Sequence, residues 1–134
     1  MYTTSPRSSN TSYDSRDAEI LENSSLKSLR RVSLDELARE SDILFVLAPG
    51  GEETYHIINE SFLKKMRKHA VLVNTARGTL VDSDALAKAL QERWIWGAGV
   101  DVVEGEPKVL KDHPLAKEPK CVQLFDSWFA LLIV

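Results

Sequence analysis

The stretch 70–78 restricts the fold of this chain more than any other. It reads Ala-Val-Leu-Val-Asn-Thr-Ala-Arg-Gly. Its first half is short, apolar and rich in β-branched residues, which predicts a buried strand. Its second half places Arg77 just past the strand end, where open parallel sheets bind ligands. A guanidinium there can hold a carboxylate through two parallel hydrogen bonds, although an ion pair with a surface acid is an equally simple interpretation.

The rest of the chain alternates between apolar runs and short amphipathic segments. Runs at 43–47, 97–102 and 120–124 predict three more strands, and the unbroken run 43–47 is typical of a strand buried on both faces. Helix starts are expected at Ser33, at 59–61 and at Asp82 or Ser83. Alternation of this kind predicts parallel βαβ units. The expected fold class is therefore α/β, with part of a doubly wound parallel sheet and flanking helices.

Three segments differ in composition. Residues 1–31 are rich in Ser, Thr and Asn and are expected to be disordered or poorly ordered. Residues 32–124 are expected to form the α/β domain, and residues 125–134 an atypical apolar tail.

The formal net charge of −3 gives no basic surface for nucleic acid. A single cysteine, Cys121, excludes an internal disulfide framework, and we expect a buried thiol and no metal site. Because no apolar run reaches the roughly 20 residues of a membrane span, a cytoplasmic protein is expected.

Two long motifs, 73–82 and 97–107, strongly resemble the D-isomer-specific 2-hydroxyacid dehydrogenases, and most of all the glyoxylate/hydroxypyruvate reductases. The resemblance covers roughly 32–124, the C-terminal part of the NAD-binding domain. It implies a Rossmann-type sheet, NAD or NADP as cofactor, and hydride transfer between the nicotinamide and a 2-keto or 2-hydroxy acid such as glyoxylate or hydroxypyruvate.

The resemblance also implies roles for single residues. Arg77 would hold the substrate carboxylate and polarise the keto oxygen, and Glu106 would pair with a catalytic histidine. Asp101 would bind the nicotinamide carboxamide. The cofactor would further be lined by Ala48, Pro49, Thr75, Ala76 and Arg77. Local alternatives exist, since Asp101 could cap a neighbouring helix and Glu106 could be a solvated loop acid.

Three parts of the family pattern are missing from the 134 residues. They contain no Gly-x-Gly-x-x-Gly loop and no substrate domain, and Asp126 stands where the family has its catalytic histidine. His56, His69 and His113 are expected to be surface, packing or turn residues. These departures imply a truncated chain with negligible turnover by itself. The alternative is a non-catalytic remnant that associates with a full-length paralogue, or forms a homodimer, through the cofactor domain.

The apolar tail is the last departure. Residues 128–134 carry no charged side chain. Such a segment could pack over the sheet, but an out-of-frame end is the preferred interpretation, because it replaces a functional motif without supplying another.

Overall fold

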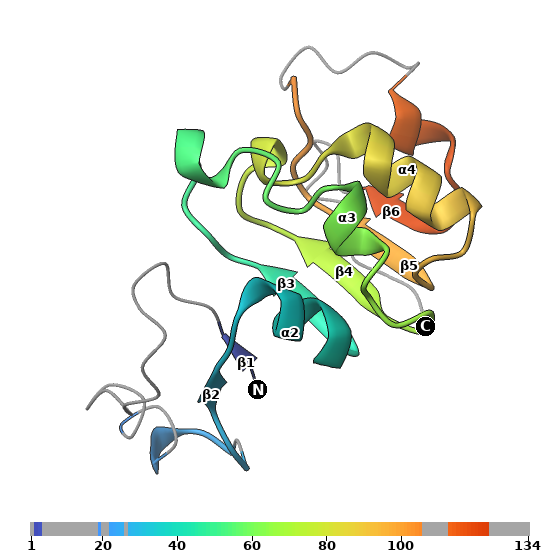
Figure 1. The fold of residues 1–134 in the computed structure, drawn as a ribbon. Helices are drawn as coiled ribbons and strands as arrows, with labels where there is room; N and C mark the ends of the chain where they lie inside the picture. The colour runs from blue at the N-terminus through green and yellow to red at the C-terminus, as the bar shows by residue number, and fades with distance from the viewer. Residues whose placement is uncertain (1, 4–18, 20–21, 26, 106–112, 124–134) are drawn as a thin grey trace.

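The computed structural model describes residues 2–3, 19, 22–25, 27–105 and 113–123. Its centre is a four-stranded sheet in the order β3-β4-β5-β6, in which every neighbouring pair is parallel (Figure 1). The strands are β3 (Ile43–Val46), β4 (Val71–Asn74), β5 (Gly97–Val100) and β6 (Cys121–Gln123). The predicted parallel α/β architecture is therefore confirmed, with strands one or two residues shorter than the apolar runs.

Helices connect these strands. They are α2 (Leu34–Glu40), α3 (Glu60–Leu63) and α4 (Ser83–Gln91), with three 3₁₀ helices, η1 (Glu52–Thr54), η2 (Gly78–Leu80) and η3 (Pro114–Lys117). The side chains of Ser33, Asn59 and Asp82 accept hydrogen bonds from backbone N–H groups of the first turns of α2, α3 and α4, as N-caps do. The expected helix starts are thus confirmed, with Asp82 rather than Ser83 as the third cap.

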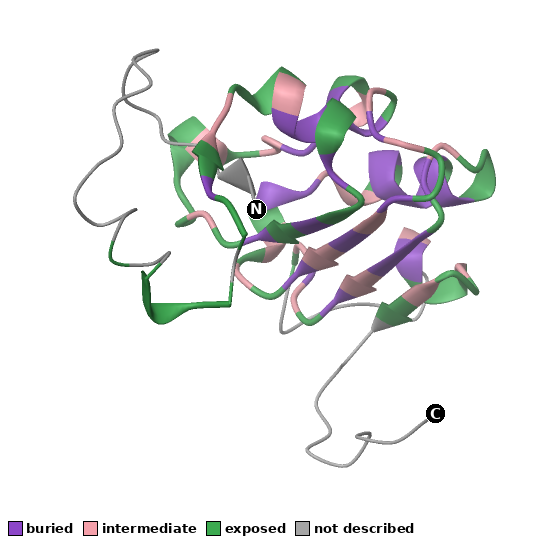
Figure 2. Cartoon of the chain, turned by 90° about the horizontal axis from the view of Figure 1, so that it is seen from below, coloured by how far each residue is buried: buried purple, intermediate pink, exposed green. Residues whose placement is uncertain are grey.

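In the described part of the chain, β3 is buried on one face only. Leu44 and Leu72 are paired in register and are 5% and 0% exposed, whereas Phe45, the next residue of β3, is 60% exposed. Burial alternates in this way along β3 and β4, and Figure 2 shows the bands on the ribbon. The prediction that the run 43–47 is buried on both faces is wrong, because the helices that contribute to the described core pack against the side of Leu44 and Leu72.

Smaller expectations also need correction. The α-helix that begins at Glu60 is only one turn long and ends at Leu63. Met66 is buried, but it lies in the turn that follows the helix. Cys121 is half-buried rather than buried. The strand β1 (Tyr2–Thr3) pairs in parallel with β2 (Arg30–Arg31), and the expectation that 1–31 is disordered or poorly ordered stays a prediction. The tail 125–134 lies outside the described residues. None of the helices in the described part of the chain is long and apolar enough to cross a membrane.

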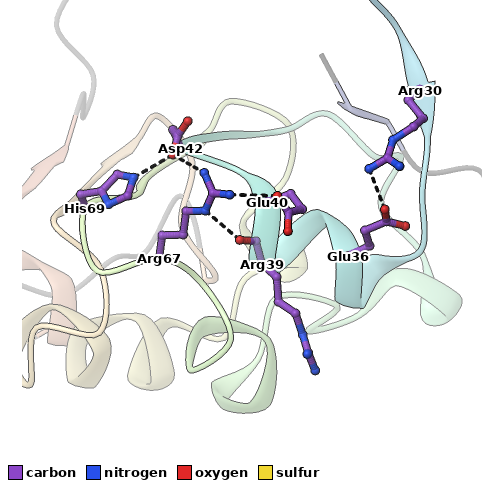
Figure 3. A network of polar contacts seen from close by, with 7 residues as sticks. All are labelled: Arg30, Glu36, Arg39, Glu40, Asp42, Arg67 and His69. Atoms are coloured by element: carbon purple, nitrogen blue, oxygen red, sulfur yellow. Dashed lines mark hydrogen bonds and ion pairs between the residues drawn. The ribbon is translucent and has the colours of Figure 1, made fainter.

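Arg67 ties together the edge of the sheet at which β3 and β4 begin (Figure 3). Its guanidinium donates to Asp42 at 2.8 Å, to Glu40 at 2.9 Å and to the backbone oxygen of Arg39 at 2.9 Å. His69 lies 2.7 Å from the same Asp42 carboxylate, and the hydrogen bonds from His69 and Arg67 hold the pKa of Asp42 below its ordinary value. Arg67, which follows α3, therefore has a structural role at the edge where the strands start.

Candidate functional site

The opposite edge of the sheet collects most of the predicted site residues. Val46, Asn74 and Val100 are aligned in register, so three chain segments leave the sheet side by side. The backbone N–H of Asp101 donates to the oxygen of Asn74 at 2.9 Å, which extends the pairing one residue beyond β5. Ala48 and Pro49 lie in the segment after β3, and Asp101 directly follows β5. The segment after β4 contains Thr75, Ala76 and Arg77. This edge is where parallel α/β sheets bind their ligands.

Asn74 shapes the turn that carries Arg77. Its side chain is fully buried at the end of β4. The amide nitrogen donates to the backbone oxygen of Arg77 at 2.9 Å, and the amide oxygen accepts from the N–H of Ala76 at 3.2 Å. No role was expected for Asn74 from the sequence, although a polar residue that closes an apolar strand is a usable signal for a side-chain-stabilised turn.

Gly78 brings the segment after β4 against the segment after β5. A Cβ atom placed on Gly78 would lie 2.1 Å from the carbonyl carbon of Val103 and 2.5 Å from the nitrogen of Glu104. Both neighbours are backbone atoms, so no side-chain rotation could relieve the overlap. Only glycine permits this approach, which holds the turn carrying Arg77 close to the segment that leads to residue 106.

Arg77 and Asp101 are both exposed at this edge. A guanidinium nitrogen of Arg77 donates to the oxygen of Ala76 at 2.7 Å, and a Cβ on Gly50 would lie 3.1 Å from Cγ of Arg77. Within the described residues Arg77 forms no ion pair and Asp101 caps no helix, so neither local alternative finds support there. Glu106 lies outside the described residues.

A second polar cluster, which the sequence analysis missed, lies beside this edge. Nε2 of His56 is 2.9 Å from Oε2 of Glu104, and the hydroxyl of Tyr55 donates to Oε1 of Glu104 at 2.9 Å. The Tyr55 and His56 rings are stacked with centroids 3.9 Å apart, and Asp82 lies 3.9 Å from Nδ1 of His56. No local pattern joins positions 56 and 104, because the fold alone brings them together. His56 is thus a contact of the segment after β5 and not simply a surface residue.

The hydrogen bond from His56 is the main cause that holds the pKa of Glu104 below its ordinary value, and the bond from Tyr55 adds to it. The carboxylate in turn raises the pKa of Tyr55. A carboxyl group with a depressed folded-state pKa contributes stability that is present above its unfolded pKa and is lost as the pH falls through the folded value. We therefore expect the segment after β5 to loosen under acidic conditions as Glu104 becomes protonated.

We predict that His56→Phe raises the pKa of Glu104 toward its ordinary value, because Phe keeps an aromatic ring but donates no hydrogen bond. The measurement is a carboxyl ¹³C NMR titration. His69→Phe is the matched control: it should leave Glu104 unchanged and raise the pKa of Asp42 instead. An unaltered Glu104 titration in His56→Phe would contradict the contact.

Comparisons with known proteins agree with this geometry. Residues 9–124 match the model of the D-isomer specific 2-hydroxyacid dehydrogenase, NAD binding domain, a match that begins well before residue 32. The glyoxylate reductase of Thermofilum pendens is 55% identical over 84 residues, which are 63% of this chain and 24% of the relative. The chain thus spans about a quarter of the length of that curated relative.

Solved structures show the same fold. The D-mandelate dehydrogenase of Rhodotorula graminis in its holo form superposes with a TM-score of 0.75 at 33% identity, over 92% of this chain and 33% of that one. The NADPH-dependent glyoxylate/hydroxypyruvate reductase of Sinorhizobium meliloti, in complex with NADP and malonate, superposes with a TM-score of 0.66 at 36% identity, over 75% of this chain and 31% of that one. The cofactor class expected for the family, NAD or NADP, is confirmed by its NAD-binding domain. The chain belongs to the D-isomer-specific 2-hydroxyacid dehydrogenase family, and its residues 9–124 match the model of that family's NAD-binding domain.

Proposed function

We propose that the edge formed after β3, β4 and β5 is the nicotinamide side of an NAD(P) site. In this proposal the chain is the later part of the cofactor domain of a dehydrogenase that acts on a 2-keto or 2-hydroxy acid such as glyoxylate or hydroxypyruvate. The observation that carries the proposal is the close contact of Gly78 with the backbone of Val103 and Glu104, because it holds the Arg77 turn beside the segment after β5.

The residues at this edge fit a nicotinamide. Ala48 and Ala76 are small and half-buried, and Pro49 has no N–H that would need a partner. Asp101 is an exposed carboxylate that can accept hydrogen bonds from a carboxamide NH₂ group. The cofactor, when bound, supplies or accepts the hydride. Ala48, Pro49, Thr75 and Ala76 would line it, and Asp101 would fix the orientation of its carboxamide.

Arg77 would bind the acid substrate. A guanidinium presents several N–H donors in one plane and can hold a carboxylate with two of them. The hydrogen bond from its guanidinium to the oxygen of Ala76 holds it at this edge, and its stem lies where a Cβ on Gly50 would be only 3.1 Å from Cγ. The malonate named for the Sinorhizobium reductase is a dicarboxylate, the class of ligand that this role requires. Glu106 would be the acid that pairs with a catalytic histidine and keeps its pKa high enough for proton donation.

The proposal is tested with nicotinamide mononucleotide, which requires no contact to an adenosine half. Its addition is expected to shift the backbone NMR signals of residues 75–78 and 101–104. Asp101→Ala should weaken binding by roughly 10- to 150-fold, since a hydrogen bond to a charged group contributes about 1.5–3 kcal/mol.

Glu92→Ala is the control for this experiment, because Glu92 is an exposed carboxylate at the other end of the sheet, after α4. Its binding should equal that of the unmodified chain. Shifts confined to α3 or α4, or equal binding by Asp101→Ala, would overturn the assignment. With NADPH and glyoxylate the same 134-residue preparation is expected to show negligible turnover, because Asp126 replaces the histidine expected as general acid.

A further inference from the structure

Tyr55 and His56 hold the carboxylate of Glu104 from two consecutive positions of the chain, and these three residues are here called the carboxylate clamp. Nε2 of His56 lies 2.9 Å from one oxygen of Glu104, and the hydroxyl of Tyr55 donates to the other oxygen at 2.9 Å. Because an ionised carboxylate only accepts hydrogen bonds, Nε2 of His56 carries the proton of this contact. The side chains of His56 and Glu104 are 26% and 35% exposed, so water screens their contact less than that of an ion pair on the open surface.

The backbone of His56 has a conformation that residues other than glycine rarely adopt. Its φ is 47°, in the left-handed region, and such a residue persists only where its surroundings determine it. Here the backbone N–H of His56 donates to the oxygen of Thr79 at 2.9 Å, and that of Ile58 donates to the oxygen of Leu80 at 3.0 Å. The turn that carries the clamp is therefore fixed against η2, directly after the predicted substrate-binding arginine.

Glu104 is fixed from its backbone as well. Gly78 packs against this backbone so closely that a Cβ atom on Gly78 would lie 2.5 Å from the nitrogen of Glu104. At the start of the same segment, the N–H of Asp101 donates to the oxygen of Asn74 at 2.9 Å. The sheet thus holds the first residue of the segment 101–104, and the carboxylate clamp holds its last residue.

We propose that Tyr55 and His56 are positioning residues for the nicotinamide edge, an inference that rests on the proposed function. The carboxylate clamp sets where the segment 101–104 stands, and with it the direction in which Asp101 faces a carboxamide. Asp82, the N-cap of α4, lies 3.9 Å from Nδ1 of His56, so the imidazole lies between acids from two different segments. Both residues act through Glu104 and not through a contact with the reacting atoms.

The test compares His56→Phe with His56→Gln by hydrogen exchange and by nicotinamide mononucleotide binding. Both variants place a side chain at the same left-handed position, but only Gln retains an N–H donor. In His56→Phe we expect several-fold faster exchange of the Asp101 amide. Binding should weaken by roughly 2- to 30-fold, the range for residues that influence a site without touching its ligand. His56→Gln should recover most of both losses.

His69→Phe serves as the matched control, because it removes a histidine–carboxylate contact of 2.7 Å at the opposite edge of the sheet. It should leave the exchange of the Asp101 amide and the binding unchanged. Amides of β4 should exchange at the same rate in all variants, which separates positioning from a general loss of stability. If His56→Phe does not fold, Tyr55→Phe replaces it, since it removes the second donor of the carboxylate clamp and keeps the ring.

The outcomes separate this inference from the proposed function. Binding that weakens in Asp101→Ala but stays equal in His56→Phe would overturn the positioning role alone. If the unmodified chain does not bind nicotinamide mononucleotide, the proposed function fails and the positioning role fails with it. Equal losses in His56→Phe and His56→Gln, or faster exchange throughout β4, would show a purely structural contribution and would also overturn the positioning role.

Discussion

Gly78→Ala is expected to lower the free energy of unfolding by roughly 3 kcal/mol or more, at the upper end of overpacking costs. The added methyl group would overlap the carbonyl carbon and oxygen of Val103, at 2.1 and 2.2 Å. Because these are backbone atoms, the segment after β5 would have to move away from the Arg77 turn. Urea unfolding followed by circular dichroism measures the loss.

Gly51→Ala is the control for this substitution, because a Cβ atom on Gly51 would meet nothing within 4 Å. Its unfolding free energy should stay within about 0.5 kcal/mol of the unmodified chain. If Gly78→Ala unfolded at the same urea concentration as Gly51→Ala, the two segments would not be held together as described. Nicotinamide mononucleotide binding should fall with stability in Gly78→Ala and persist in Gly51→Ala.

Asn74→Leu is expected to cost about 2 kcal/mol. Leu is close to Asn in shape but leaves the N–H of Ala76 and the oxygen of Arg77 without their side-chain partner, and a buried polar group that loses its hydrogen bond costs about 1–3 kcal/mol. The same urea titration measures the effect. Thr75→Val, at the exposed neighbouring position, should change the unfolding free energy by less than about 0.5 kcal/mol.

Asn74→Asp adds a pH test of the same turn. A protonated carboxyl can accept from Ala76 and donate to the oxygen of Arg77, as the amide does, whereas a carboxylate would face that oxygen with a negative charge. Burial and this repulsion raise the pKa of the introduced carboxyl group. Its contribution is therefore present at low pH and lost as the pH rises through the folded pKa. A destabilisation that did not depend on pH would argue against the described orientation of the amide.

Periodicity and capping residues were enough to place most of the elements. The apolar runs at 43–47 and 70–74 predicted β3 and β4 within one residue at each end, and Ser33 and Asn59 predicted the starts of α2 and α3. These signals are local, because a strand or a helix cap depends on residues that are close in the chain. The parallel order of the strands followed from the alternation of strands and helices.

The candidate site was partly predictable for the same reason. The end of a parallel strand is visible in the sequence, so Thr75, Ala76, Arg77 and Asp101 could be assigned to one edge of the sheet before the structure was known. The motifs around them supplied the family, which the match over 9–124 confirms. The roles of the individual residues stay predictions.

Contacts between distant segments required the fold. Gly78 packs against the backbone of Val103, 25 residues later in the chain, and His56 contacts Glu104, 48 residues later. Neither composition nor hydrophobic periodicity predicts these two contacts. The exposed face of β3 belongs to the same class, because an apolar run specifies which residues avoid water but not on which side a covering layer stands. Local patterns thus account for the elements and their edge, while packing between segments accounts for the shape of the site and for which face of β3 is buried.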